Sequence, residues 1–189
     1  MTTTFQSAVE DAGRLLERID SNETSLDSEL PGIIEYLKSE ETARGFFVAL
    51  LTGDSRLPNS LPASFVRVMQ SSEIACDLLV KNLVMSTNMS LTHERNNKRE
   101  MASLSRRVAS RAQAIIRAVG QNHIQKFTRA MQSAILVALS ARGTCKSDAA
   151  PECGDETNPL VTRYVQFLNK WNYDIEQLSL CKEQLDKLF

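Results

Sequence analysis

The sequence predicts an all-α protein, a helical bundle of about six or seven helices with a long C-terminal helix. Three observations support this fold class. Apolar residues recur at steps of three and four along most of the 189-residue chain, which is the spacing of one helix face. Glycines and prolines are few, seven and five, and they cluster between the periodic segments. No segment shows a convincing strand pattern.

The N-terminal part of the chain predicts helices separated by short polar segments. Apolar residues at 5–19 have helical spacing, and an acidic loop is expected at 21–29. Pro31 is compatible with the first turn of a short helix that follows it. Residues 40–51 predict a helix with Ser39 as its N-cap and a dense apolar end, which indicates a central position in the core.

Two further helices are expected before the middle of the chain. One has Pro62 in its first turn and runs to about Gln70, and the next begins after Ser71 or Ser72. The apolar stripe of the second continues toward His93, and the Asn96-Asn97 pair weakens the helical pattern there.

A basic, amphipathic helix is the main feature of the second half of the chain. When residues 95–119 are placed at 100° per residue, the apolar side chains gather on one face and most cations on the other. The apolar face comprises Met101, Leu104, Val108, Ala112, Ile115 and Val119. The far side is the candidate partner-binding surface and comprises Arg95, Lys98, Arg99, Arg106 and Arg117. Arg107 and Arg111 lie at the border with Glu100, where we expect them to hold the helix against a neighbour.

The remaining chain is expected to contain two helices and a linker. Gly120 ends the basic helix or weakens a longer one, and a helical pattern follows to Arg142. We therefore divide the chain into a helical core domain (1–143), an acidic flexible loop (144–158) and a C-terminal helix (159–189). The C-terminal helix repeats apolar residues at steps of four and three, so it either packs on the core or associates through heptads.

The apolar faces of the predicted helices together predict a hydrophobic core. We expect its members to be Phe46, Phe47, Leu50, Leu78, Leu79, Leu104, Val108, Ile115, Phe127, Ile135, Leu168 and Trp171.

The net charge of −1 hides a charge asymmetry. Residues 1–45 carry ten acids and four bases, a net of −6, whereas residues 93–129 carry nine bases and two acids, a net of +7. The two regions either complement each other within the fold or create a dipolar surface that steers a charged partner. With no secretory signal and no apolar run long enough for a membrane span, the chain is expected to be cytoplasmic and to have no membrane partner.

The cysteines and acids give weak signals for a special site. The four cysteines form no C-x-x-C pair; Cys76 and Cys181 fit helix cores, and Cys145 and Cys153 share a polar loop in which they could pair if oxidised. His93 and His123 are the two histidines, and neither lies next to a cysteine pair or three residues after a glutamate. We therefore predict no metal site and no cofactor, and the acids of the loop are expected to be solvated.

These observations leave three classes of function open. No phosphate-binding loop, dinucleotide fingerprint or hydrolase elbow occurs, so whether the protein is an enzyme is undecided and no catalytic residue can be named. The first hypothesis is a non-catalytic interaction or adaptor protein, acting through the basic helix face or the C-terminal heptads on a protein partner or a second copy. The alternative is a small helical enzyme or accessory protein that acts on an apolar metabolite in an inter-helix cavity. The third, weak nucleic-acid binding, has little support because aromatic residues are sparse beside the cations.

Overall fold

The computed structural model describes residues 4–143 and 158–189, and these residues form helices and connecting turns with no strand among them. The all-α fold class is thereby confirmed. Within the described residues there are ten helices, where the sequence predicted six or seven. They are α1 (Phe5–Asp20), α2 (Leu26–Tyr36), α3 (Glu40–Thr52), α4 (Leu57–Ser60), α5 (Ala63–Ser71), α6 (Glu73–Arg95), α7 (Arg99–Val119), α8 (Gln121–Ala141), α9 (Pro159–Trp171) and α10 (Ile175–Asp186).

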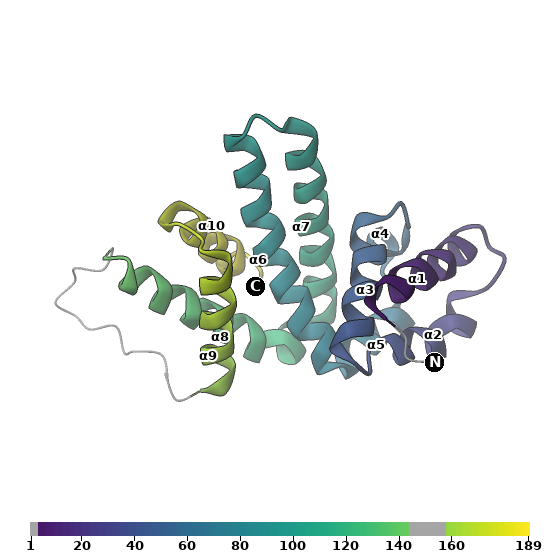
Figure 1. The fold of residues 1–189 in the computed structure, drawn as a ribbon. Coiled ribbons are helices and arrows are strands. Elements are labelled where there is room, and N and C mark those ends of the chain that lie inside the picture. Colours follow the sequence, from purple (N-terminus) through teal and green to yellow (C-terminus); the bar gives the residue numbers. More distant parts are fainter. Residues whose placement is uncertain (1–3, 144–157) are drawn as a thin grey trace.

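A long antiparallel hairpin of α6 and α7 forms the centre of the molecule (Figure 1). Helices α1–α5 lie on one side of the hairpin, where α1 packs along α3. Helices α8–α10 lie on the other side, where α9 and α10 pack on α8 and α10 also contacts α6. The far ends of α6 and α7, with the loop that joins them, project beyond both groups of helices (Figure 1).

The core follows the predicted apolar faces with two exceptions. Nine of the expected core residues are buried and Val108 is half-buried against them. The prediction is wrong for Leu104 and Trp171, since each residue is 47% exposed. Leu104 has the right helical phase, but α3, α4 and α5 cover only the lower turns of α7. Trp171 is the last residue of α9, where the chain turns away.

The basic segment is divided between two helices. Asn97 has a left-handed φ of 58°, which asparagine tolerates better than most residues, and the chain reverses direction there. Arg95 therefore ends α6 while Arg99 begins α7, and one helical wheel through both residues was wrong. Gly120 ends α7, the first of the two alternatives, with φ 83° and ψ 151°, a conformation open essentially to glycine alone.

The C-terminal segment also differs from its prediction, because two helices replace one long helix. Asn172 adopts a left-handed φ of 48° after α9. Asp174 then caps α10 by accepting from the backbone N–H of Gln177, whose side chain accepts in return from the Asp174 N–H. This capping box lies inside the heptad pattern, where the apolar periodicity conceals it.

Polar side chains cap the starts of α2 and α9. Ser25 caps α2, so this helix begins well before Pro31 and shortens the expected acidic loop. Asn158 caps α9 by accepting from the N–H of Leu160 at 2.9 Å. The rest of the predicted 144–158 loop, with Cys145 and Cys153, lies outside the described residues. Throughout the described ranges, no helix combines the length and apolar composition needed to cross a bilayer.

Candidate functional site

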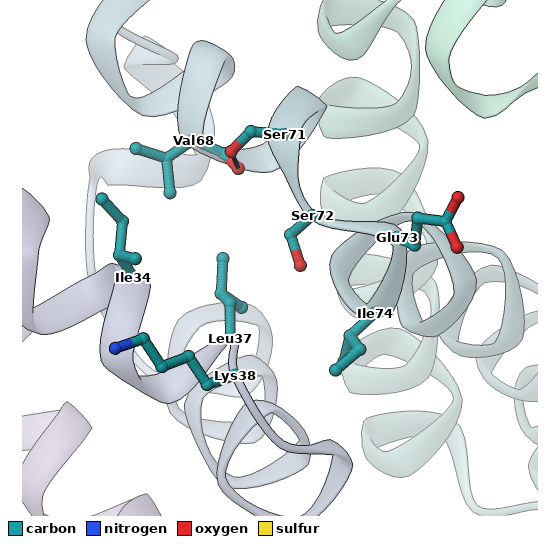
Figure 2. A pocket seen from close by; sticks show the side chains of 8 residues that line it. All are labelled: Ile34, Leu37, Lys38, Val68, Ser71, Ser72, Glu73 and Ile74. Atoms are coloured by element: carbon teal, nitrogen blue, oxygen red, sulfur yellow. Dashed lines mark hydrogen bonds between the residues drawn. The ribbon is translucent and has the colours of Figure 1, made fainter.

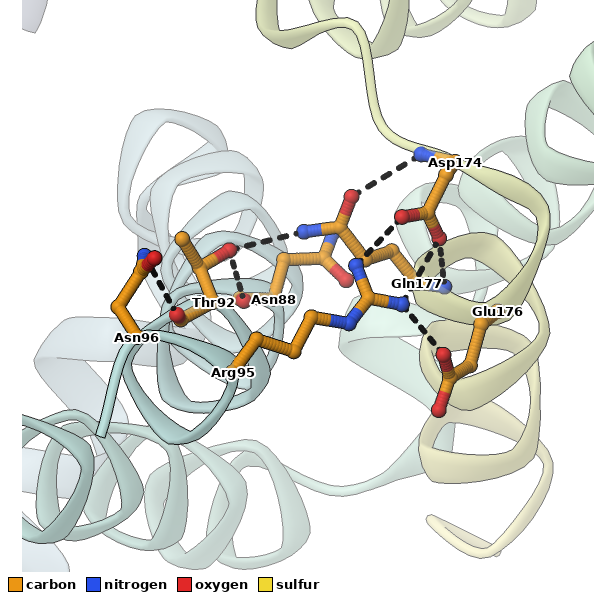
Figure 3. A network of polar contacts seen from close by, with 7 residues as sticks. All are labelled: Asn88, Thr92, Arg95, Asn96, Asp174, Glu176 and Gln177. Carbon is orange, nitrogen blue, oxygen red and sulfur yellow. Dashed lines mark hydrogen bonds and ion pairs between the residues drawn. The ribbon is translucent and has the colours of Figure 1, made fainter. Parts of the chain in front are cut away.

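Arg95 of the predicted basic face is engaged in a polar network that joins α6 to α10 (Figure 3). Its guanidinium donates to Asp174 Oδ2 at 2.5 Å and also pairs with Glu176. Gln177 adds a second link by donating to the hydroxyl of Thr92 at 3.0 Å. The Arg95 guanidinium lowers the pKa of Asp174 and the two carboxylates raise the pKa of Arg95. These contacts attach α10 to α6, so Arg95 has a role within the fold.

Arg106 and Arg117 are engaged as well. Arg106 pairs with Glu94 across the α6–α7 hairpin. Arg117 donates to the backbone carbonyl of Lys187 at 2.9 Å, close to the C-terminal end. Lys98 and Arg99 are the members of the predicted set without an ion pair among the described residues. The five cations are thus spread over several contacts.

Arg107 and Arg111, at the border of the apolar face of α7, have the structural role expected from the helical wheel. Arg111 is 8% exposed and donates to the carbonyls of Leu51, Gly53 and Ser55 at 3.1, 2.6 and 3.1 Å. Arg107 donates to the carbonyl of Thr52 at 2.6 Å. Both side chains therefore hold α7 against the end of α3.

An exposed apolar patch lies at the projecting end of α7. We call Lys98, Met101 and Leu104 the tip patch, because residues three apart lie on the same side of a helix. Met101 and Leu104 are each 47% exposed. Further along the same face, Ile115 and Val119 are buried in the core. The tip patch is thus the uncovered end of a stripe that is otherwise core.

Residues that could perform catalysis are kept apart. His93 lies near the end of α6 and His123 in the first turn of α8, so the length of α7, about 30 Å, separates them. Cys76 and Cys181 are free and buried, as predicted, and burial raises the pKa of their thiols to about 11 and about 12. A protonated, inaccessible thiol is a poor nucleophile. Within the described parts of the chain, no three His, Cys, Asp or Glu residues are grouped to hold a metal ion.

A hollow of about 300 Å³ lies between α2, α5 and the start of α6 (Figure 2). Its wall is mainly apolar, with Ile34 and Val68 on one side and Ile74 on the other (Figure 2). The Ser72 hydroxyl accepts from the N–H of Ala75 and so serves as the cap of α6. Lys38 pairs with Glu35 of its own segment. Nothing in this hollow brings a nucleophile next to a base.

A polar cluster around Asp77 was not predicted from the sequence. Asp77 of α6 accepts from the Tyr164 hydroxyl at 2.5 Å and from Arg163 at 3.0 Å, and pairs with Lys81 at 2.8 Å. Burial raises the pKa of Tyr164, as does the nearby carboxylate. The available signal was an acid within the apolar stripe of α6, which required a partner from a distant segment.

The fold and the site define a helical protein with a projecting hairpin, an exposed apolar patch at its tip and no assembled catalytic group among its described residues. Residues 4–143 match the model of the family described as Uncharacterised conserved protein UCP020893, and the chain belongs to that family. No curated protein and no solved structure matches the chain. The matched region contains α1–α8 and hence the tip patch, whereas α9 and α10 lie beyond the match.

Proposed function

We propose that this protein is a non-catalytic interaction protein that binds a protein partner through the tip patch. The observation that carries the proposal is the exposure of Met101 and Leu104, 47% each, on a helix whose apolar stripe is half-buried at Val108 and buried from Ala112 onward. Uncovered apolar side chains on a projecting, regular helix match one way in which helical proteins contact partners. The flexible thioether of Met101 adapts to an apolar partner surface.

The basic face gives less support to binding than the tip patch does. Arg95, Arg106 and Arg117 already have acceptors within the chain, so binding a phosphate or carboxylate would compete with those contacts. Lys98 borders the apolar pair, and Arg99 lies on another side of α7. The proposal therefore assigns the main contact to the apolar pair and a flanking role to Lys98. Nucleic-acid binding through the whole basic face is less favoured for the same reason.

Affinity capture from the native source, with purified wild type and a Met101→Glu/Leu104→Glu variant as bait, tests the proposal. We expect a partner protein to bind the wild type at a defined stoichiometry and to be lost from the variant, because two carboxylates on the patch prevent apolar contact. The matched control is Arg99→Glu/Arg106→Glu, which changes charge on another side of the same helix. Circular dichroism and melting temperature verify that both variants fold.

The outcomes separate the proposal from its alternatives. Retention of the partner by the Met101→Glu/Leu104→Glu variant with loss by the Arg99→Glu/Arg106→Glu variant would move the binding site to the basic face. Retention by both variants would exclude both surfaces. If the wild type captures no stoichiometric partner, the interaction function itself is contradicted.

A further inference from the structure

A groove between α3 and α9, with α6 as its floor, is a second surface with a defined chemistry. The groove encloses a cavity of about 260 Å³. Helix α3 and the start of α1 form one wall, and the last turns of α9 form the other. We call this cavity and its lining the α3–α9 groove. It lies at some distance from the tip patch, since its floor is the first half of α6.

The lining of the α3–α9 groove is rich in large apolar side chains. Val48 and Phe5 contribute from one wall and Phe167 and Trp171 from the other, above Leu78 and Met85 on the floor. Phe5, Val48 and Trp171 rank among the exposed large apolar residues of the described chain. Three such residues around one cavity form an apolar site. In the absence of a ligand, water contacts this apolar surface at a free-energy cost.

Cations surround this apolar lining. Arg44 lies on the α3 wall, with its guanidinium 5.5 Å from the centre of the Phe5 ring, and Lys170 lies on the α9 wall. Neither Arg44 nor Lys170 has an ion pair with any residue in the described ranges. Lys81 lies on the floor, 2.8 Å from Asp77 and 3.7 Å from Glu40. Glu40 lines the groove as well, so the lining carries three cations and one carboxylate. Arg44 and Lys170 are the two cations without an ion pair, one from each wall, and Lys81 is partly neutralised.

Polar contacts hold each wall of the groove, a buried one on the α9 side and an exposed one between α1 and α3. Asp77 on α6 binds the Tyr164 hydroxyl and Arg163 of α9, and the same carboxylate holds Lys81. On the opposite side, the backbone N–H of Phe5 donates to Glu41 of α3 at 3.1 Å. A site whose walls are already positioned loses less entropy when a ligand binds.

From these features we propose that the α3–α9 groove binds a small apolar carboxylate. The carboxylate lies between Arg44 and Lys170, and the hydrocarbon or aryl part lies on Val48, Phe167 and Leu78. A ligand of this class satisfies both the surplus positive charge and the apolar lining. The volume of about 260 Å³ lies near the lower end of the usual range for small-molecule sites, about 300–1,000 Å³, which favours a short ligand.

This site is independent of the interaction function proposed above, and it uses a part of the chain that the family match does not cover. Trp171 provides a direct test, because it is the single tryptophan of the protein and lines the groove. The probe is octanoate, kept below its micelle concentration, and 1-octanol is the neutral analogue. Binding is followed by Trp171 fluorescence and by the indole N–H signal in ¹H–¹⁵N NMR spectra.

Octanoate is expected to cause a saturable change in both signals and to bind more tightly than octanol. An Arg44→Gln/Lys170→Gln variant should weaken octanoate binding about tenfold or more while octanol binding changes little. The matched control, Arg67→Gln/Arg129→Gln, removes two exposed cations elsewhere and should bind as the wild type does. Absence of a saturable change, or equal affinity for octanoate in the wild type and the Arg44→Gln/Lys170→Gln variant, would overturn the proposal.

Discussion

Arg111 of α7 donates to the backbone carbonyl of Gly53, the residue that ends α3, across 2.6 Å. The last carbonyls of a helix have no partner within that helix, and here they face the interior of the molecule. The planar guanidinium reaches the carbonyls of Leu51 and Ser55 at the same time. Burial lowers the pKa of Arg111, a cost that the three acceptors offset. One side chain thus closes the end of α3 and attaches the hairpin to the N-terminal helices.

Replacement of Arg111 by lysine should lower the free energy of unfolding by about 2–3 kcal/mol. A lysine ammonium is a compact charge that cannot reproduce the fork geometry, so carbonyls of α3 would lose their donors. Urea unfolding monitored by circular dichroism measures the change. Arg117→Lys is the control, because Arg117 is exposed and makes one hydrogen bond, to the Lys187 carbonyl; we expect a loss below about 1 kcal/mol. Equal losses in the two variants would contradict the role assigned to Arg111.

The contact between α1 and α3 depends on a glycine. A Cβ atom placed on Gly45 would lie 2.6 Å from the Cβ of Ala8 and 3.0 Å from the carbonyl oxygen of Phe5. We therefore expect Gly45→Ala to destabilise the protein by about 1–3 kcal/mol, since backbone atoms of α1 cannot move aside without separating the helices.

Gly13 is the matched control for that substitution, because it lies on α1 with nothing within 4 Å of its added Cβ. In a helix interior, alanine is favoured over glycine by about 0.5–1 kcal/mol. Gly13→Ala should therefore raise the melting temperature, and Gly45→Ala should lower it. A rise in melting temperature in both variants would show that helix propensity, rather than the close approach of α1 and α3, determines the effect.

The buried thiols should make stability sensitive to alkaline pH. Burial raises the pKa of Cys76 from 9.0 to about 11 and that of Cys181 to about 12. The folded state therefore keeps protons that the unfolded chain releases above pH 9. This contribution to stability is complete below pH 9 and is lost as pH rises toward 11 and 12, by up to about 1.4 kcal/mol per pH unit for each thiol.

Thiol labelling and pH-dependent unfolding together test this expectation. In a Cys145→Ser/Cys153→Ser background, Cys76 and Cys181 should resist a disulfide reagent at pH 8 until urea unfolds the chain. A further Cys181→Ala substitution should reduce the fall in unfolding free energy between pH 9 and pH 10.5. Rapid labelling of the folded protein would show that these thiols are accessible.

The sequence predicted the helical class and most buried faces because apolar spacing depends on local chain geometry alone. The left-handed turn at Asn172 was missed, since it does not interrupt the apolar spacing clearly. At Asn97 the sequence predicted a weakened helix but not a reversal of the chain. The role of Arg111 could be inferred because a cation at the border of an apolar face needs an acceptor on a neighbouring helix. The roles of Arg95 and Arg117 could not, because Asp174 and the Lys187 carbonyl come from segments about 70 to 80 residues away.

In the candidate sites, too, local features could be predicted from the sequence and contacts between distant segments could not. Helical phase placed Leu104 on the correct side of α7, but phase does not determine how far a neighbouring helix extends. The α3–α9 groove combines residues from four helices, so no local pattern indicated it. Asp77, an acid within an apolar stripe, was the one local signal of the contact that positions α9, and the sequence-based prediction did not include it.

The two ends of the apolar stripe of α7 differ in burial, and the effect of that difference on stability can be measured by substitution. Leu104→Ala removes a side chain that is 47% exposed, so we expect it to change the free energy of unfolding by no more than about 0.5 kcal/mol. Ile115→Ala lies on the same face, three turns further, where the side chain is fully buried. That substitution leaves a cavity and should cost about 2–5 kcal/mol. A large loss of unfolding free energy in Leu104→Ala would mean that another part of the molecule covers the tip in solution. The tip patch would then belong to the core and would not be a binding surface.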